Sequence, residues 1–257
     1  MSRRRILISN DDGIGSPFAA RFLGAFADAG FDALAVFPAS EQSWIGRAYS
    51  RHRRLSLADA GAISGVRVMT VDGTPSDCVN IALGHLFEGG LPDAVVSGIN
   101  IGQNIGLPLL WSSGTFAAAA EGAGWGLPSF AFSLQLASEY YEICRIRHAP
   151  PPPALDAVLG AACAHAASFV LERLDAGEGR EGSVHNVNYP LDYCASTEFS
   201  ACEPASVGMR PLYRRSPDGG FEFKYSIGEG VSRSGLRTDM QCLAESAACF
   251  SIVKVVP

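Results

Sequence analysis

The sequence lacks long apolar runs, closely spaced cysteine pairs and extended basic stripes. Each apolar stretch is interrupted by glycine, proline or a charged residue within about 10 positions, whereas a membrane span needs roughly 20 apolar residues. The first apolar run, residues 6–8, is too short for the core of a signal peptide. These absences predict a cytoplasmic protein that has no membrane partner.

The cysteines and the charges argue against two further classes of protein. The cysteines number seven, an odd count, and no two stand at CxxC spacing, so neither a disulfide framework nor a zinc site is indicated and reduced thiols are expected. The net charge is −6, and basic residues gather only at residues 3–5 and 47–54. Tracking a phosphodiester backbone needs a longer basic stripe, so no stable nucleic-acid partner is expected.

What is present fits a globular chain. Its 257 residues are 47% hydrophobic and include 28 glycines and 15 prolines, enough for a substantial core with many turns. Apolar runs that lack polar alternation are typical of parallel strands covered by helices on both faces. We therefore expect an α/β fold of the Rossmann-like, doubly wound kind with a mainly parallel sheet. Its expected strands are 6–8, 33–37, 66–71, 94–97 and 130–132, separated by helices over 18–28, 77–86 and 115–124.

The order of elements changes after residue 133. Four prolines at 150–153 break the chain, and a helix over 154–174 and a strand over 184–187 are expected to follow. The remainder reads as loops with short β segments. We predict a Rossmann-like catalytic core over residues 1–193 and a C-terminal extension over 194–257, packed on the core and contributing to an oligomer interface.

Open parallel sheets bind ligands beyond the carboxyl ends of their strands, so polar segments that follow apolar runs are candidate sites. The first such segment is 10–13. Adjacent carboxylates at Asp11 and Asp12 repel each other unless a cation lies between them, and a hard divalent ion prefers such oxygen ligands. Gly13 would let the backbone turn. The alternative is an Asp-Asp-Gly turn in which an aspartate caps the next helix.

Three other polar segments follow predicted strands or precede a helix. Residues 37–43 present hydroxyls and amides but are, taken alone, only a loop. Residues 97–106 place Asn100 and Asn104 among three glycines, which suits a metal or phosphate site, although a glycine-rich turn is the alternative. Residues 112–115 precede a helix of small residues, which suits an anion site or a plain Ser/Thr cap. A carboxylate pair and an anion site together indicate a phosphate-hydrolysing centre.

Five segments in order resemble the SurE survival-protein family: 10–13, 39–43, 73–79, 95–106 and 113–115. The resemblance covers residues 5–133 and beyond them rests on 186–190 and on Thr238 and Asp239. It implies a Rossmann-like domain whose C-terminal extension builds homodimers or homotetramers. It also implies hydrolysis of nucleoside monophosphates, as 5′- or 3′-nucleotides, with one divalent metal ion per subunit, Mg²⁺ or Mn²⁺.

The resemblance also assigns roles to residues. The expected metal ligands are Asp11, Asp12, Ser43 and Asn100, the expected substrate-binding residues are Asn10, Gly13, Asn104, Ser113, Gly114 and Thr115, and the expected catalytic residues are Asp11, Asp12 and Asn104. We expect a metal-activated water to attack the phosphorus. The rival is attack by the Ser113 hydroxyl, which needs a base that no histidine or lysine nearby in the sequence supplies.

The chain departs from the family pattern at two places. Trp44 stands where the family usually has glycine after the ligand serine, and residues 107–111 are apolar where an acidic pair commonly follows the asparagine-rich loop, with one extra residue before Ser113. All proposed metal ligands remain. The departures therefore bear on which leaving group is accepted more than on metal binding.

Other readings of the sequence are weaker or predict a different class. A dinucleotide site would need a third glycine after Gly13 and Gly15, and a haloacid-dehalogenase-like phosphatase would need aspartate at Asn10. The five histidines match no triad or metal spacing, so core or surface roles are expected. Asp77 is expected to cap or orient a helix, with a supporting role at the site as the alternative. A non-catalytic metal- and nucleotide-binding module remains the alternative function.

Overall fold

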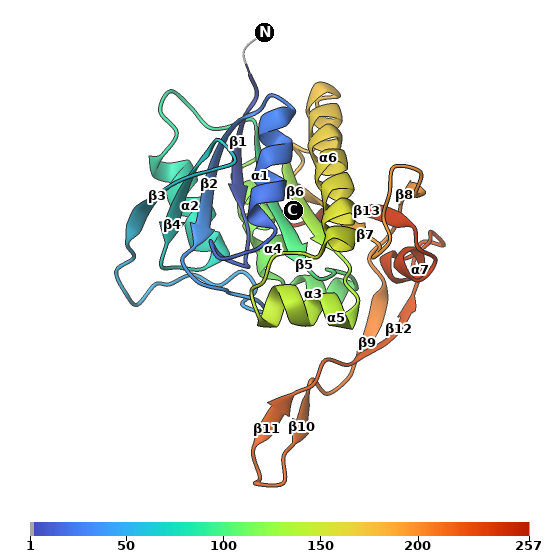
Figure 1. Ribbon diagram of the computed structural model, residues 1–257. Coiled ribbons are helices and arrows are strands. Elements are labelled where there is room, and N and C mark those ends of the chain that lie inside the picture. The colour runs from blue at the N-terminus through green and yellow to red at the C-terminus, as the bar shows by residue number, and fades with distance from the viewer. Residues whose placement is uncertain (1–2, 257) are drawn as a thin grey trace.

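A nine-stranded sheet runs through the computed structural model, which describes residues 3–256 (Figure 1). The strand order is β3-β4-β2-β1-β5-β6-β7-β13-β8, and the six strands from β4 to β7 in this order are mutually parallel. The predicted mainly parallel sheet is confirmed. The strands are β1 Arg5–Ser9, β2 Asp32–Pro38, β3 Leu57–Ile63, β4 Val66–Val71, β5 Ala94–Ile101, β6 Ser129–Leu134, β7 Ser183–Tyr189, β8 Phe199–Ala201 and β13 Ala248–Lys254.

Helices cover both faces of this sheet. Helices α1 (Ala19–Asp28) and α6 (Pro153–Asp175) pack together on one face, and α2 (Pro75–His85) and α4 (Gly114–Gly124) pack together on the other. The result is the three-layer arrangement expected of a doubly wound fold. The shorter helical elements are α3 (Leu107–Leu110), α5 (Ser138–Tyr141), the adjoining η1 (Glu142–Ile146) and α7 (Asp239–Ala244).

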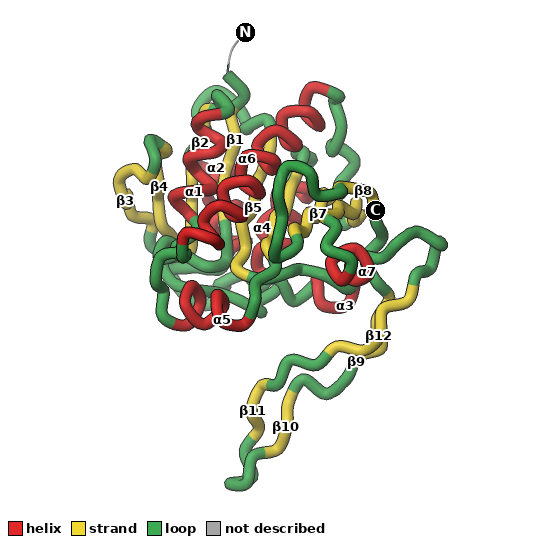
Figure 2. Tube along the Cα trace, turned by 45° about the vertical axis from the view of Figure 1, so that its right-hand side comes forward, coloured by secondary structure: helices red, strands yellow, loops and turns green. Residues whose placement is uncertain are grey.

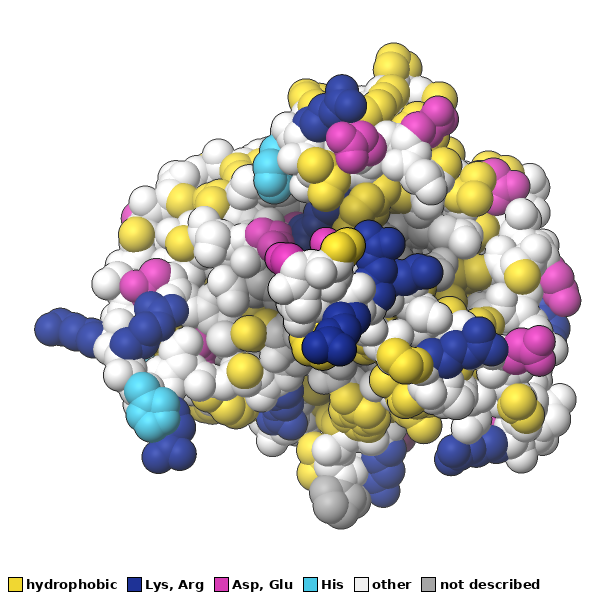
Figure 3. All heavy atoms as spheres, turned by 90° about the horizontal axis from the view of Figure 1, so that it is seen from below, with side chains coloured by type: hydrophobic (Ala, Val, Ile, Leu, Met, Phe, Trp, Pro, Cys, Tyr) yellow, Lys and Arg dark blue, Asp and Glu magenta, His cyan; other side chains and the backbone are white. Residues whose placement is uncertain are grey.

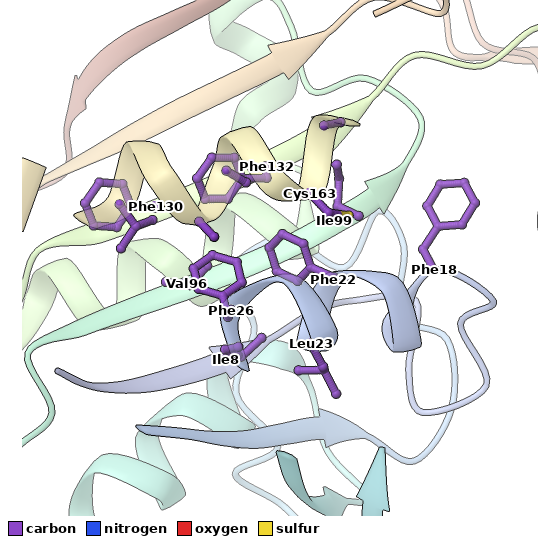
Figure 4. Close-up of a cluster of buried hydrophobic side chains, with 14 of the residues drawn as sticks. Ile8, Phe18, Phe22, Leu23, Phe26, Val96, Ile99, Phe130, Phe132 and Cys163 are labelled. Carbon is purple, nitrogen blue, oxygen red and sulfur yellow. The ribbon is translucent and has the colours of Figure 1, made fainter. Parts of the chain in front are cut away.

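The larger core cluster lies between the sheet and the α1/α6 layer (Figure 4). Phe22 and Phe26 are one helical turn apart on α1, so both point at the sheet, and their rings meet edge to face at 5.0 Å. Phe22 also packs against Phe132 of β6 at 6.0 Å. Because these rings are fully buried, they fix the position of α1 on the sheet and, with it, the loop that leads from β1 into the helix.

The capping of α2 confirms the role expected for Asp77. The Thr74 hydroxyl accepts from the backbone N–H of Asp77 at 3.1 Å, and the Asp77 carboxylate accepts from the backbone N–H of Thr74 at 2.9 Å. This is a capping box, which satisfies two free donors at the start of the helix. Asp77 therefore acts on the helix, and it does not line the cavity described below.

Helix α6 corrects one expectation about membranes. Within residues 3–256 it is the one helix long and apolar enough, by length and composition, to cross a membrane, whereas the apolar runs of the sequence had predicted none. Its single glycine and few charged residues do not lower its mean hydropathy enough to exclude a membrane span, because it contains many alanines. Leu155, Leu159 and Phe169 lie buried against α1 and the sheet, and 44% of the apolar window is buried in the fold. This is the burial pattern of a helix that covers a sheet.

Residues after 194 occupy two different places. Strands β8 and β13 join the main sheet, with β13 antiparallel to β7. In the sequence between β8 and β13, strands β9 (Ser206–Met209) and β12 (Ile227–Val231) form an antiparallel ribbon that continues into β10 (Tyr213–Arg215) and β11 (Phe221–Phe223). We call residues 206–231 the arm, because they project from the body of the molecule in both views (Figures 1 and 2). The role of residues 194–257 in an oligomer stays a prediction.

Candidate active site

The candidate site lies at the point where the connections of the sheet reverse direction. Strand β1 pairs with β2 on one side and with β5 on the other, and ligands of open α/β sheets bind in the crevice outside such strand ends. Ser9 of β1 pairs with Ser97 of β5, so Asp11 and Asp12 follow directly at the carboxyl end. Strand β5 runs on to Ile101, four residues past the predicted end, so Asn100 lies on the strand itself.

The turn after β1 is held by Asn10 and Gly13. The Asn10 side chain accepts from the backbone N–H of Gly13 and donates to its carbonyl, both at 3.1 Å. Gly13 has a φ of +76°, and a Cβ there would lie 2.9 Å from the Ser40 carbonyl carbon, so only glycine lets the two loops approach. Both residues position the aspartates, and their predicted substrate contacts stay predictions.

The start of α4 packs directly against Asp11. The Thr115 hydroxyl donates to Asp11 Oδ1 at 2.5 Å, and a Cβ on Gly114 would lie 2.6 Å from the Asp11 Cβ. Ser113 caps the helix by accepting from the backbone N–H of Phe116 at 3.0 Å. The structure therefore brings Ser113, Gly114 and Thr115 to the carboxylate pair, with the Thr115 hydroxyl already committed to Asp11.

Asp12 is held from two sides. Its Oδ2 accepts from the backbone N–H of Ile101 at 3.2 Å, and its Oδ1 accepts from Arg145 Nη1 at 2.6 Å. Arg145 Nη2 also donates to the Ser43 hydroxyl and to the Glu41 carboxylate. One guanidinium cation thus bridges two carboxylates and the predicted ligand serine. Arg145 is not recognisable as a site residue from the sequence, because it lies on η1 (Glu142–Ile146), a short segment without helical periodicity.

Burial controls the ionisation of the two aspartates. Burial raises the pKa of Asp11, although the Thr115 hydrogen bond and the Arg145 charge oppose the shift. Burial, and then the charge of Asp11, raise the pKa of Asp12 to about 7. Two neighbouring buried carboxyl groups that resist ionisation are the environment in which a bound cation gains most.

The asparagine-rich loop is fixed to the sheet by β7. The Asn104 side chain donates to the Ser133 hydroxyl at 2.9 Å, and the Asn104 carbonyl accepts from the side chains of Asn186 and Asn188 at 3.0 and 2.9 Å. The Asn188 side chain in turn accepts from the Asn104 backbone N–H at 2.9 Å. The side-chain N–H of Asn100 donates to the Gly102 carbonyl at 2.9 Å, so the side-chain oxygen Oδ1 of Asn100 takes no part in this hydrogen bond.

These elements surround one cavity of about 850 Å³. Its polar wall includes Asp11, Ser43, Asn100, Asn104 and Ser113, while Asp12 lies behind it and is connected through Arg145. The oxygen donors of Asp11, Asp12, Ser43 and Asn100 suit a hard divalent cation. The structure thus gathers the predicted ligands at one place.

Aromatic side chains form the outer rim of the cavity. Trp44, Tyr141, Phe223 and Tyr225 line it and are each between two fifths and one half exposed. Trp44 packs against Phe223 at 5.0 Å and against Tyr225 at 5.9 Å. It holds a φ of +61°, an uncommon conformation for so bulky a residue that occurs more often at functional sites. The face seen from below places acidic, basic and hydrophobic side chains next to one another (Figure 3).

The second departure from the family pattern forms a helix. Residues 107–110 make α3, in which Leu110 is buried, and only Leu109 of the segment lines the cavity. Trp111 turns away and packs edge to face on Phe116 at 5.7 Å. Of the two departures, Trp44 therefore contributes more to the rim of the cavity than residues 107–111 do.

Comparison with known proteins shows which sequences this chain resembles. Residues 6–212 match the model of the family described as Survival protein SurE. A 5′-nucleotidase SurE from Methanothrix thermoacetophila is 39% identical over 136 residues, 53% of this chain and 51% of that protein. The 5′-nucleotidase SurE 1 of Thermus thermophilus is 46% identical over 137 residues, 52% of this chain and 53% of that protein. The chain thus spans about half the length of the curated relatives it matches.

A solved structure supports the fold over nearly the whole chain. The crystal structure of the SurE protein from Aquifex aeolicus superimposes with a TM-score of 0.73, covering 98% of this chain and 94% of that one at 22% sequence identity. At this identity the likeness concerns the fold alone. Because the family model matches most of the sequence, including all five site segments, this chain belongs to the SurE family.

Proposed function

We propose that this protein is a hydrolase, a 5′/3′-nucleotidase that converts nucleoside monophosphates to nucleosides and inorganic phosphate with the help of a divalent metal ion. The observation that carries the proposal is the buried pair Asp11 and Asp12 in contact with the first residues of α4. The pair suits a cation and the helix start suits a phosphate, and the two meet at one cavity. Relatives that bear the name 5′-nucleotidase support the choice of substrate.

The metal would be held by Asp11, Asp12, Ser43 and Asn100, one ion per subunit. Mg²⁺ and Mn²⁺ suit this all-oxygen set. When bound, such an ion lowers the pKa of coordinated water and neutralises charge on the phosphate. The place of the Arg145 guanidinium, between Asp12 and Ser43, supports the assignment because it shows that these groups accept a shared cation.

The remaining roles fall to groups of this chain. The free backbone N–H groups at the start of α4 and the Ser113 hydroxyl would bind the phosphate oxygens, and Asn104 would orient them. Asp11 or Asp12 would accept the proton of the attacking water. Ser113 itself is a poor nucleophile, since within residues 3–256 its hydroxyl is hydrogen-bonded by the Phe116 N–H and by no histidine or lysine side chain.

The aromatic rim supports a nucleoside as the leaving group. Trp44 directly follows Ser43, a proposed metal ligand. Its indole packs against Phe223 and Tyr225 at the mouth of the cavity. A nucleobase attached to a bound phosphate would reach this rim and stack on it. Base stacking on an aromatic side chain is worth about 1–3 kcal/mol, or roughly 5- to 150-fold in binding.

The test is phosphate release across a panel of nucleoside 5′- and 3′-monophosphates with Mg²⁺, Mn²⁺ or EDTA. We expect turnover that requires the added metal and is abolished in Asp12→Asn. Glycerol 2-phosphate, which has no ring, separates the parts of the proposal: Trp44→Ala should raise the KM for AMP about tenfold or more and leave glycerol 2-phosphate hydrolysis unchanged. Nucleotide binding without any phosphate release would instead establish the non-catalytic module.

The finer assignments of location and assembly are also proposals. A cytoplasmic location is supported by the seven cysteines, none of which is paired in a disulfide within residues 3–256. Assembly as a homodimer or homotetramer is supported by the arm, which exposes Met209, Tyr213, Phe221 and Val231 each by more than half. A projecting ribbon with so much exposed apolar surface is typical of an interaction surface.

A further inference from the structure

Three cysteines far apart in the sequence meet in the C-terminal part of the fold. Cys202 follows β8, Cys242 lies on α7 and Cys249 lies on β13. All three are buried, and their sulfur atoms lie within 4.8 Å of one another. Their spacing in sequence resembles no metal motif, so the sequence alone predicts no thiolate site.

The backbone holds the three residues in fixed positions. Cys249 lies on a strand paired on both sides, opposite Asn188 of β7 and Ser200 of β8. The backbone N–H of Cys202 donates to the Phe250 carbonyl at 2.8 Å, and the carbonyl of Cys242 accepts from the Ala247 N–H at 2.8 Å. The sulfur atoms therefore converge without a flexible loop among them, which lowers the ordering cost of binding an ion.

The geometry of the cluster suits a three-coordinate ion. A metal–thiolate bond of about 2.3 Å in a trigonal arrangement places sulfur atoms about 4 Å apart, within the observed limit. Among residues 3–256, no histidine, aspartate, glutamate or fourth cysteine joins this cluster. Structural zinc almost always takes four ligands, and soft thiolates also select Cu(I). A closed three-sulfur set thus favours Cu(I) over Zn²⁺.

A second observation concerns charge. The Arg237 guanidinium lies beside Cys242 and interacts electrostatically with it as well as with the carboxylates of Glu198 and Glu245. The guanidinium hydrogen-bonds to the Cys242 side chain, and its Nη2 atom lies 3.5 Å from a carboxylate oxygen of Glu245. A hydrogen bond to a charged group is stronger than one to a neutral group. The Arg237 cation would therefore stabilise an anionic thiolate at Cys242.

We propose that Cys202, Cys242 and Cys249 form a binding site for a soft thiophilic ion, Cu(I), separate from the nucleotidase centre. Binding releases the three thiol protons to solvent, forms three copper–sulfur bonds and changes no oxidation state, because the ion arrives as Cu(I). The resulting complex carries two negative charges, one of which Arg237 balances. The proposal is independent of the proposed function, since none of its residues lines the cavity described above.

The test uses the reduced, metal-free full chain under anaerobic conditions, titrated with Cu(I) against the chelator bicinchoninate. We expect one Cu(I) per chain, with the ultraviolet absorption and luminescence of a shielded copper–thiolate centre. Cys202→Ser and Cys242→Ser should each weaken binding by about 100-fold or more, since loss of a ligand exceeds the 10- to 100-fold cost of losing a supporting contact. The matched control is Cys194→Ser, which alters an exposed cysteine outside the cluster and should leave binding unchanged.

Three results would overturn the site. The wild-type chain could bind no more Cu(I) than the double variant Cys202→Ser/Cys242→Ser, or the losses could appear equally in Cys194→Ser. The third is a disulfide between two of the three cysteines, found by mass spectrometry in air-exposed protein that takes up no Cu(I) after reduction. Thermal unfolding of each metal-free variant shows whether a lost site reflects a lost ligand or a lost fold.

Discussion

Replacing Asp12 with asparagine should stabilise the metal-free protein while it removes a metal ligand. Asp12 is 4% exposed and adjoins Asp11, and burial followed by that neighbour's charge raises the pKa of Asp12 from 3.8 to about 7. Because the pKa is higher in the folded state, the carboxyl group favours folding fully only below pH 3.8, and this contribution is lost as the pH rises through about 7. Asparagine keeps the shape of the neutral carboxyl group at every pH.

The size of the effect follows from the two pKa values. Each pKa unit corresponds to about 1.4 kcal/mol, so ionised Asp12 costs up to about 4 kcal/mol of unfolding free energy at pH 8. We expect metal-free Asp12→Asn to exceed the wild type by about 2–4 kcal/mol at pH 8, because the asparagine amide also faces the Ile101 N–H and replaces one good acceptor imperfectly. The advantage should shrink steadily as the pH is lowered toward 4.

Urea unfolding in EDTA across this pH range measures the difference, with Asp192→Asn, an exposed aspartate, as the matched control. Adding Mn²⁺ at 100 times its dissociation constant should then stabilise the wild type by about 2.7 kcal/mol and leave Asp12→Asn unchanged. The difference in unfolding free energy between Asp12→Asn and the wild type would then shrink or change sign. If Asp12→Asn unfolds at lower urea than the wild type at pH 8 in EDTA, the carboxylate is well solvated or well paired and the reasoning about the buried pair is refuted.

Three further outcomes are expected. Arg145→Gln leaves Asp12 and Glu41 without their shared cation and should lower the unfolding free energy in EDTA at pH 8 by about 3 kcal/mol. Added Mn²⁺ should restore most of this loss in urea unfolding. Equal stability of the variant and the wild type would show that the bridge contributes nothing. Gly114→Ala forces a Cβ to 2.6 Å from that of Asp11, so it should lower the unfolding free energy by about 1–3 kcal/mol and kcat/KM at least tenfold. The control is Gly160→Ala, in open space on α6, which should be neutral or slightly stabilising. Replacing residues 212–224 of the arm with a short Gly-Ser turn should lower the subunit number in light scattering, and an unchanged mass would exclude this part of the arm as the interface.

The sequence was informative where one physical rule dominates. Apolar runs without polar alternation identified the central parallel strands, since only strands buried on both faces have that pattern. The placement of Asp11, Asp12 and Asn100 followed from the rule that ligands bind beyond the carboxyl ends of parallel strands. Residues 97–106 were read as loop from Ser97 onward because glycine and asparagine are poor strand formers, yet pairing with β6 extends β5 to Ile101.

Contacts between distant segments could not be read from the sequence. Arg145 reaches Asp12 across more than a hundred residues, and nothing local in residues 138–146 marks it as part of the site. Asp239 is a similar case: it starts α7, and its carboxylate accepts from the backbone N–H groups of Ala205 and Gly106. This explains why Thr238 and Asp239 accompany the site motifs. Strand β3 was missed because it is an edge strand with an almost fully exposed, weakly apolar sequence.

The place of β13 has a consequence for how the chain is made. This strand lies between β7 and β8 in the sheet although it is the last strand in the described sequence. During synthesis every residue of the candidate active site leaves the ribosome before residues 248–254 do, and until then β7 presents an edge without its antiparallel neighbour. An unpaired edge of this kind is a template for intermolecular pairing. Nascent chains that stall between residues 190 and 248 should therefore carry all the proposed metal and phosphate residues and still depend on chaperones to stay unaggregated.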